Sequence, residues 1–383
     1  MAHSEPTGTH RDRLLDKGAR SNGCGPYNPG HISTHASVKS LNSDSILAAF
    51  SNIEEQLRAR AEADLYRRRL VVSSAQGREL IVDNRKLLNF CSNDYLGLAN
   101  DERVRAAFRQ GIDRWGVGSG ASHLVCGHTS AHHELEESLA EFTGRPRSLL
   151  FSSGYAANLG TINALVGNGD HIFEDRLNHA SLLDGGLISG ARFKRYQHRD
   201  AASLNAELEA CNASSGRKLV ISDGTFSMDG TVCDVAALTN VTRQHGAWLM
   251  IDEAHSLGVL GKQGRGLIGA QEFGTDDVQI LVGTLGKAFG TQGGFVAGSD
   301  ALIETLIQQA RTYIYSTALP AAVAVATRAS LQIAIDEEWR RERLRELDEV
   351  FRDGGTQIGL RLSESQTPIQ PIMLGTEKSA LAM

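Results

Sequence analysis

The chain has 383 residues, of which 41% are hydrophobic and 22% charged, and its formal net charge is −6 at pH 7. This balance is typical of a soluble globular protein of two or three domains, and an acidic chain without a basic stripe is a poor general nucleic-acid binder. The five scattered cysteines form no C-x-x-C pair, and no apolar stretch approaches the length of a membrane span or signal peptide, so we predict reduced thiols and a cytoplasmic protein.

The first quarter of the chain is predicted to contribute little to the core. Residues 1–44 are rich in Ser, Gly, His and Asn without apolar periodicity, which predicts a disordered leader. Apolar residues at helical spacing then predict a helix between Asp44 and Arg69, ending in the basic cluster 67–69. Two short strand patterns, LIVDN and LLNFCS, precede the turn-rich SNDYLGLAN. We assign residues 45–99 to an N-terminal arm.

From about residue 100 the pattern alternates between helices and short apolar strands. Residues 130–143 place Leu135, Leu139 and Phe142 on one helical face, and Gly144 is expected to end that helix. Four apolar runs are bounded by glycine or polar residues: SLLF (148–151), LVIS (219–222), WLMID (248–252) and QILVGT (279–284). The pattern predicts an α/β fold, with a mostly parallel sheet wrapped by helices, over residues 100–335.

The end of the chain is predicted to form part of a second, smaller domain. Residues 300–350 read as charged helices, and IQPIML (369–374) has the pattern of a last short strand. We assign residues 336–383 to a partial small C-terminal domain.

The informative polar residues stand where the apolar runs end. Sheets of this kind bind ligands just beyond the carboxyl ends of their strands. The residues there are Ser153–Gly154, Asp223–Ser227, Asp252–His255 and Thr284–Lys287. Each has an ordinary interpretation as a cap, turn or solvated charge, but their shared position in the topology favours a functional site.

Several other site types do not fit. GVGSGAS (116–122) lacks the third glycine of a dinucleotide fingerprint and follows a helical segment instead of a strand. HHELEE is not the H-E-x-x-H of a zinc protease, and the chain contains neither a G-x-S-x-G elbow nor a phosphate-binding P-loop motif. No metal is therefore predicted.

A strand-end lysine with a separate aspartate fits pyridoxal 5′-phosphate. The cofactor aldehyde needs an amine, its ring nitrogen needs a carboxylate that keeps the ring protonated, and its phosphate needs amides at a helix N-terminus. Lys287, Asp252 and the turn Ser153-Gly154-Tyr155 can supply these groups. A lysine out of water also has a lowered pKa, which makes it a usable nucleophile and base.

Six motifs together make the chain resemble the α-oxoamine synthases, which are fold-type-I pyridoxal-phosphate enzymes. They are NDYLGL (93–98), SGYAAN (153–158), NHASLLDG (178–185), GTFSMDG (224–230), IDEAHSLGVLG (251–261) and GTLGKAFG (283–290). The resemblance covers about residues 50–383. It implies a decarboxylative condensation of an amino acid with an acyl thioester. The 67–69 cluster and YIYSTALPAA (313–322) look most similar to members that join L-alanine to a pimeloyl thioester in biotin synthesis.

The resemblance assigns the catalytic roles residue by residue. Lys287 would bind the cofactor aldehyde and later remove the α-proton, and Asp252 would pair with the ring nitrogen. His179 would stack on the ring face, although a capping or solvent-facing histidine remains the alternative. His255 and Ser227 would hydrogen-bond the phenolic oxygen, and His255 would also assist proton transfer.

The resemblance likewise assigns binding roles. Beside Ser153, the amides of Gly154 and Tyr155 would hold the phosphate together with the Thr284 hydroxyl. Ser316 and Thr317 would reach the phosphate of a neighbouring subunit, which implies a homodimer with shared sites. Asn93 and Arg67 would lie near the acyl substrate, whose free carboxylate a guanidinium can clamp; a surface arginine is an equal alternative for Arg67. His123 stands where some relatives have arginine, and it receives no role.

Two alternatives stay open. The family also includes enzymes that use glycine with acetyl-CoA, or serine with a long acyl chain. Family members moreover continue beyond the position of Met383, and that part carries an arginine that holds the amino-acid carboxylate. A catalytically idle, pyridoxal-phosphate-binding homodimer is therefore the second alternative to an active acyltransferase, and the acyl carrier, CoA or a carrier protein, stays undecided.

Overall fold

The computed structural model describes residues 50–211 and 215–383, and the chain divides into two units, 1–66 and 67–383. The described part of the first unit contains helix α1 (Ile53–Glu62). This helix lies inside the predicted one but ends before the basic cluster 67–69, so that end was predicted wrongly. Asp64 has a φ of +56°, which ends helical geometry there. The predicted leader, residues 1–44, lies outside the described residues.

The second unit begins with a two-stranded hairpin. Strands β1 (Glu79–Val82) and β2 (Arg85–Leu88) pair antiparallel, which confirms the two strand patterns predicted there. The turn between them is Asp83-Asn84, and both residues have positive φ values of 49° and 59°. Asn and Asp tolerate this conformation, and two such residues make the tight turn that matches the twist of a hairpin.

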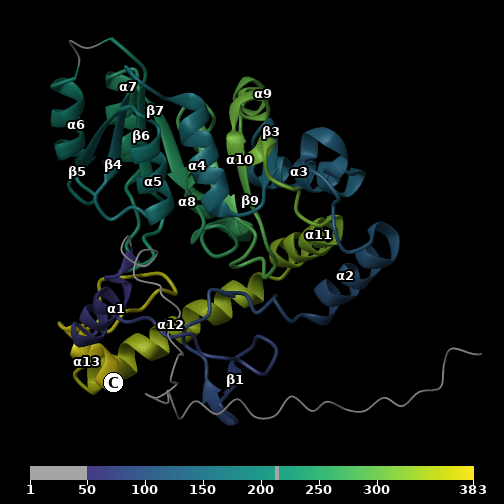
Figure 1. Cartoon of the computed structure of the whole chain (residues 1–383), viewed down its shortest axis with the longest axis vertical. Coiled ribbons are helices and arrows are strands. Elements are labelled where there is room, and N and C mark those ends of the chain that lie inside the picture. The colour runs from purple at the N-terminus through teal and green to yellow at the C-terminus, as the bar shows by residue number, and fades with distance from the viewer. Residues whose placement is uncertain (1–49, 212–214) are drawn as a thin grey trace, which may run out of the picture. The chain divides into compact units, whose positions relative to one another are not determined.

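A seven-stranded sheet forms the centre of the second unit (Figure 1). Its strand order is β3-β9-β8-β7-β6-β4-β5, and only β9 runs antiparallel to its neighbours. The strands are β3 (Arg147–Phe151), β4 (His171–Asp175), β5 (Arg192–Tyr196), β6 (Lys218–Asp223), β7 (Trp248–Asp252), β8 (Ile280–Thr284) and β9 (Gly294–Gly298). This confirms the mostly parallel sheet and its four predicted strands.

Three strands were not predicted, because their side chains do not form an apolar run. Charged residues interrupt β4, which reads HIFED, and β5, which reads RFKRY. Strand β9 reads GFVAG and has a glycine at each end, so its apolar run is only three residues long. β4 is nonetheless buried along its whole length, because it lies between β5 and β6 in the sheet.

Helices cover both faces of the sheet. The helices of the second unit are α2 (Glu102–Trp115), the π-helix η2 (His123–Gly127), α3 (Ser130–Thr143), α4 (Gly154–Leu165), α5 (Ala180–Ile188), α6 (Ala201–Glu209), α7 (Val235–Gln244), the 3-10 helix η3 (Lys262–Gly264), α8 (Gly266–Ala270), α9 (Asp300–Gln309), α10 (Arg311–Ile314), α11 (Ala321–Asp336), α12 (Glu338–Gln357) and α13 (Glu377–Ala382). Of these, α3, α7 and α11 lie on one face of the sheet, and α4, α5 and α9 lie on the other. The predicted helix 130–143 is confirmed, and Gly144 ends it in the left-handed conformation.

Each central strand contributes to two separate apolar cores. Along β7, Leu249 and Ile251 pack into one cluster, whereas Met250 between them packs into the other. The first cluster draws side chains from α3, α7 and α11, and the second from α4, α5 and α9. Because both faces are buried, these strands read as unbroken apolar runs, and this made them recognisable in the sequence.

The last predicted strand was wrong. IQPIML forms no strand; its contact with the rest of the chain includes one isolated bridge, between Ile372 and Leu362. Pro371 lacks a backbone N–H, which disfavours a paired strand at this point. The division into a leader, an arm, a large domain and a partial small domain stays a prediction.

None of the helices in residues 50–211 and 215–383 combines the length and the apolar character that a membrane span requires. Four of the five cysteines lie in this part of the chain, and all four are free thiols: Cys91 and Cys126 are exposed, and Cys211 and Cys233 are buried.

A buried acid in β4 should give folding a measurable pH dependence. Glu174 is 1% exposed, and burial raises its pKa to about 8, so it is protonated in the folded state at neutral pH but ionised when unfolded. Between pH 4.5 and 8 this residue should therefore lower the free energy of unfolding by about 1.4 kcal/mol for each pH unit gained.

The Glu174→Gln variant lacks this ionisation. Urea unfolding between pH 5 and 8 should show a flatter pH dependence for the variant than for the unchanged chain. Parallel profiles for the two proteins would refute the assignment of a protonated carboxyl.

Candidate active site

Three neighbouring strands deliver polar groups to one edge of the sheet. β6 ends at Asp223, β7 ends at Asp252 and β8 ends at Thr284, and Asp223 pairs with Asp252 in the strand register. Both carboxyl groups are buried, with 4% and 5% of their surface exposed. The sheet therefore places two acids side by side at the position where this class of sheet binds ligands.

Lys287 lies at the same edge and is largely withdrawn from water. Its Nζ is 2.7 Å from His255 Nε2. Burial lowers the pKa of Lys287, and the nearby Asp252 and Asp223 only partly offset this effect. An amine of lowered pKa is more often unprotonated at neutral pH, which is the form that can act as a nucleophile or base.

His255 connects this lysine to the segment 93–98. Its Nδ1 is 2.7 Å from the Tyr95 hydroxyl, which donates to Asn93 Oδ1 at 3.4 Å. Because the Tyr95 hydroxyl donates its hydrogen to Asn93, its oxygen can accept from His255 Nδ1–H. The other ring nitrogen, His255 Nε2, then accepts from Lys287 Nζ. Burial, and then the Lys287 charge, lower the pKa of His255 to about 3, so the ring stays neutral. Tyr95 was not predicted as a site residue, although it stands inside the NDYLGL motif.

One glycine makes this connection sterically possible. The turn that follows Lys287 ends at Gly290, which has a φ of +63°. A Cβ at this position would lie 2.3 Å from the Ala99 backbone nitrogen. The lysine loop can therefore pack directly on the backbone of the segment that carries Tyr95, because residue 290 has no side chain.

Asp252 is held in place by two hydrogen-bond donors. Asn158 Nδ2 donates to Oδ2 at 2.7 Å, and the Ala254 backbone nitrogen donates to Oδ1 at 2.9 Å. Asn158 also donates to Ser181 Oγ at 2.9 Å, and this oxygen is 2.8 Å from His179 Nδ1. Asn158 and Ser181 were not predicted; Asn158 closes the SGYAAN motif and is 1% exposed, a rare position for an amide.

The Asp223 carboxyl group is protonated. Burial, and then the adjacent Asp252, raise the pKa of Asp223 well above its ordinary value, so Asp223 holds a proton. Asp223 Oδ2 accepts from the His179 backbone nitrogen at 2.7 Å. This bond holds His179 next to the strand ends, and the His179 side chain is exposed there. A buried carboxylate beside an exposed aromatic ring matches the needs of a protonated pyridine ring.

A helix N-terminus faces the same region. Ser153 caps α4, accepting from the Ala156 backbone nitrogen, and Gly154 begins the helix. A Cβ on Gly154 would lie 3.7 Å from Thr284 Oγ1, so the turn and the end of β8 are neighbours. The free amides and the dipole of a twelve-residue helix favour a phosphate. The Tyr155 side chain points elsewhere, since its hydroxyl donates to Asp184.

Four other predicted site residues lie outside this hydrogen-bonded group: Ser227, Ser316, Thr317 and Arg67. Ser227 is half-buried in the turn after β6. Thr317 forms an isolated bridge with Ser122, next to Ser316. Arg67 lies in an exposed segment without helix or strand, whereas Asn93 joins the group through Tyr95.

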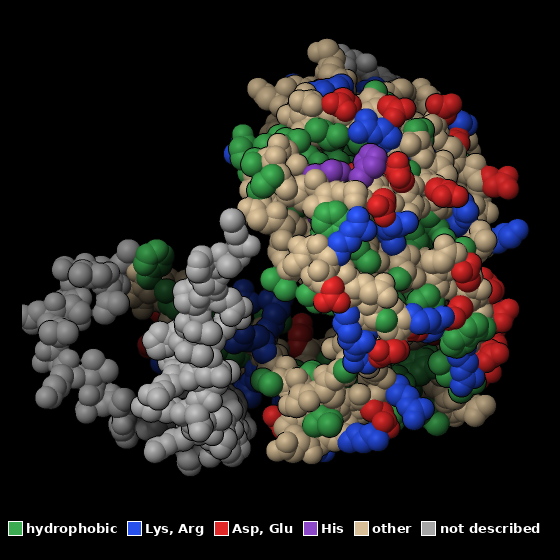
Figure 2. Space-filling model, turned by 90° about the vertical axis from the view of Figure 1, so that its right-hand side faces the viewer, with side chains coloured by type: hydrophobic (Ala, Val, Ile, Leu, Met, Phe, Trp, Pro, Cys, Tyr) green, Lys and Arg blue, Asp and Glu red, His purple; other side chains and the backbone are tan. Residues whose placement is uncertain are grey.

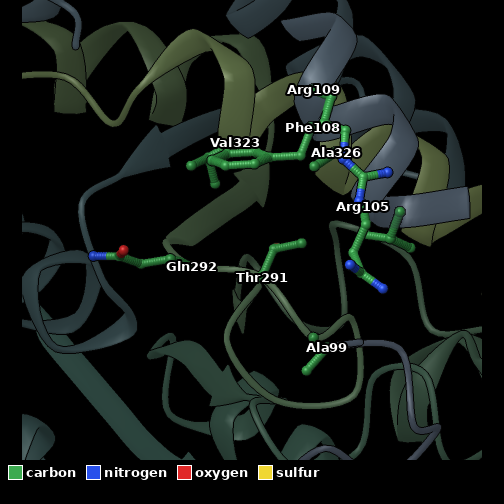
Figure 3. A pocket seen from close by; sticks show the side chains of 10 residues that line it. Ala99, Arg105, Phe108, Arg109, Thr291, Gln292, Val323 and Ala326 are labelled. Atoms are coloured by element: carbon green, nitrogen blue, oxygen red, sulfur yellow. The ribbon is translucent and has the colours of Figure 1, made fainter. Parts of the chain in front are cut away.

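A cavity of about 300 Å³ lies beside the loop that follows Lys287, where Thr291 and Gln292 line it (Figure 3). It is lined by residues of the loop, of α2 and of α11, among them Thr291, Phe108 and Val323. None of its lining residues belongs to the predicted site, and its two arginines, Arg105 and Arg109, both pair with Glu102. This cavity is distinct from the edge that carries Lys287.

The parallel sheet, the buried carboxylate, the lysine and the helix N-terminus together define a fold-type-I pyridoxal-phosphate enzyme. The chain belongs to the aminotransferase class I and II family, whose model matches residues 85–383, and within it to the α-oxoamine synthases. Its cofactor is pyridoxal phosphate.

Three relatives define the similarity more closely. The chain is 58% identical to 8-amino-7-oxononanoate synthase of Pseudomonas putida KT2440, over 87% of this chain and 84% of the relative. It is 59% identical to the enzyme of that name from Nitrosococcus oceani, over 86% of each chain. Among solved structures, serine palmitoyltransferase of S. paucimobilis, which has pyridoxal phosphate and myriocin bound, is 28% identical with a TM-score of 0.78 over 84% of each chain.

A substitution of Tyr95, which was not predicted as a site residue, tests the hydrogen-bonded series that links Lys287, His255 and Tyr95. Tyr95→Phe leaves His255 Nδ1–H without its acceptor, and losing one buried hydrogen bond costs about 1–3 kcal/mol. We expect kcat/KM to fall about 10-fold and the acid limb of its pH profile to move, because the position of His255 beside Lys287 is no longer fixed. Cofactor content should stay unchanged. An unaltered pH profile would show that Tyr95 has only a structural role.

Proposed function

We propose that this chain catalyses the decarboxylative condensation of L-alanine with a pimeloyl thioester, giving 8-amino-7-oxononanoate for biotin synthesis. The single observation that carries the proposal is 57–59% identity to several proteins named 8-amino-7-oxononanoate synthase, over more than four-fifths of each chain. Serine palmitoyltransferase is a similar structure at much lower identity, so alanine with a pimeloyl thioester is favoured over serine with a long acyl chain.

The site supplies the groups that this reaction needs. When bound, pyridoxal phosphate supplies an electron sink for negative charge at the amino-acid α-carbon. Asp252 would hold the ring nitrogen, and the amides of Gly154 and Tyr155 with Thr284 would hold the phosphate. Lys287, its pKa lowered by burial, would bind the cofactor covalently and take the proton from the α-carbon.

Further contacts complete the proposed site. His179 would cover the ring face, and His255 with Ser227 would bind the phenolic oxygen. The chain from Lys287 through His255 and Tyr95 reaches Asn93, which supports a place for Asn93 beside the reacting atoms. Arg67 would bind the free carboxylate of the pimeloyl chain.

We also propose a homodimer in the cytoplasm. Ser316 and Thr317, which lie outside the group around Lys287, would serve the phosphate of the partner subunit. The exposed thiols Cys91 and Cys126 are consistent with a reducing compartment.

A turnover assay tests the proposed reaction. The purified chain is given L-alanine with pimeloyl-CoA, glycine with acetyl-CoA, or serine with palmitoyl-CoA, and CoA release and the condensed product are measured. We expect kcat/KM to be highest for alanine with pimeloyl-CoA. Repeating the first pair with a pimeloyl carrier protein identifies the preferred acyl carrier.

Two results would overturn parts of the proposal. A higher kcat/KM for either other pair would reassign the substrates within the family. Cofactor binding without turnover of any pair, including the carrier-protein substrate, would support the catalytically idle alternative.

A further inference from the structure

A group of histidines surrounds the start of α3, and the proposed reaction uses none of them. His123 lies in η2, His128 follows it, and His132 and His133 lie in the first turns of α3, one turn before Glu136. Figure 2 shows histidine side chains gathered at the surface beside acidic ones. His132 has both ring nitrogens engaged, with the Leu319 carbonyl at 2.7 Å and with Thr129, so it serves as a structural residue.

Three of the other side chains converge. One ligand atom each from His128, His133 and Glu136 lies within 4.8 Å of the others. His128 Nε2 and Glu136 Oε2 are 3.9 Å apart. His133 and Glu136 stand three residues apart on one helix, a spacing that puts both on the same face. Two imidazoles and a carboxylate are the ligands of many zinc sites that keep a fourth position for water.

The surrounding residues already orient two of these ligands. His128 Nδ1 is 2.9 Å from His123 Nδ1, which leaves His128 Nε2 directed toward Glu136. His123 is itself fixed, because it is 8% exposed and stacks on Tyr313 with ring centroids 4.9 Å apart. Glu136 Oε1 accepts from the Leu150 backbone nitrogen at 2.9 Å, which leaves Oε2 for another partner. Such hydrogen bonds behind the ligands are a regular feature of metal sites.

We propose that His128, His133 and Glu136 form a binding site for a divalent transition-metal ion, with Zn²⁺ as the best match to their donor atoms. The site would tie the segment after η2 to α3.

The side chains need to move only slightly to bind the ion. Zinc–nitrogen distances near 2.0 Å in a tetrahedron place ligand atoms roughly 3.3 Å apart. The 3.9 Å between His128 and Glu136 is close to this value. The His133 side chain is 64% exposed and its Nε2 is 3.4 Å from Glu137 Oε1, so it is free to rotate toward the other two at the cost of a weak surface contact.

The experiment is a titration of the full chain, loaded with pyridoxal phosphate and treated with chelator, with Zn²⁺. Binding is followed by calorimetry, and Co²⁺ is used in parallel because its visible spectrum reports the ligands. We expect one Zn²⁺ per chain. The His133→Gln and Glu136→Gln variants should lose this binding. His123→Phe, which removes only the orienting bond, should weaken it about 10- to 100-fold.

Matched variants separate the site from nonspecific binding. Glu141→Gln alters an exposed acid further along α3, and Cys126→Ser removes a nearby exposed thiol; both should bind Zn²⁺ as the unchanged chain does. Because His133 is exposed, its substitution should leave the fold intact, which circular dichroism checks. The proposal is overturned if the chain binds no Zn²⁺, if His133→Gln binds as well as the unchanged chain, or if Cys126→Ser abolishes binding.

Discussion

Replacing Lys287 with alanine should abolish turnover, with a loss of at least about 10⁴-fold in kcat, the upper range for loss of a general base. The substitution removes the amine that the proposed reaction uses twice, for holding the cofactor and for moving the α-proton. Burial lowers the pKa of Lys287, which favours its unprotonated form. A solvent-exposed lysine stays protonated at neutral pH, so it cannot replace Lys287 as a nucleophile or base. The readouts are CoA release from pimeloyl-CoA and, independently of activity, borohydride reduction followed by mass spectrometry of the peptide that contains residue 287.

The matched control for this variant is Lys262→Ala, which alters an exposed lysine in η3. It should keep both turnover and the pyridoxyl mass addition on Lys287. If Lys287→Ala retained turnover within about 10-fold, or if the mass addition were found on another lysine, the assignment of the catalytic amine would fail.

Asp252→Asn should reduce kcat/KM by about 10²- to 5 × 10³-fold, because an uncompensated buried charge costs about 3–5 kcal/mol. The amide keeps the shape of the carboxylate, and its oxygen can still accept from Asn158, whereas its NH₂ group then faces the Ala254 N–H. The loss therefore reports the missing charge together with one lost hydrogen bond. Without the cofactor the variant should be as stable as the unchanged chain or more stable, because Asp252 is crowded against Asp223. The measurements are steady-state kinetics, equilibrium cofactor affinity, and thermal unfolding with and without cofactor.

Asp223→Asn is the control on the neighbouring strand. Burial and Asp252 keep Asp223 protonated, so the neutral amide resembles its native form and should change kcat/KM only slightly. Equal losses in the two variants would contradict the assignment of Asp252, and not Asp223, as the partner of the cofactor ring nitrogen.

The sequence predicted those features that depend on local pattern. The strands that end in Asp223, Asp252 and Thr284 were recognisable because burial on both faces makes them continuous apolar runs. The topology of a parallel sheet then predicts that their carboxyl ends meet at one edge, which places Lys287 and His255 near Asp252. Strands β4 and β5 escaped prediction because charged residues interrupt them, and only their neighbours in the sheet explain their pairing.

Only the tertiary structure decided which groups touch. Tyr95 meets His255 across 160 residues of chain, and Asn158 meets Asp252 across 94, so no local pattern could pair them. The same holds for His128, His133 and Glu136, whose spacing matches no metal motif until the turn between η2 and α3 brings them together. Residue types and strand ends are properties of short segments, and the sequence by itself therefore determined the class of site. Contacts, burial and the resulting pKa shifts depend on packing between distant segments, which the folded chain alone defines.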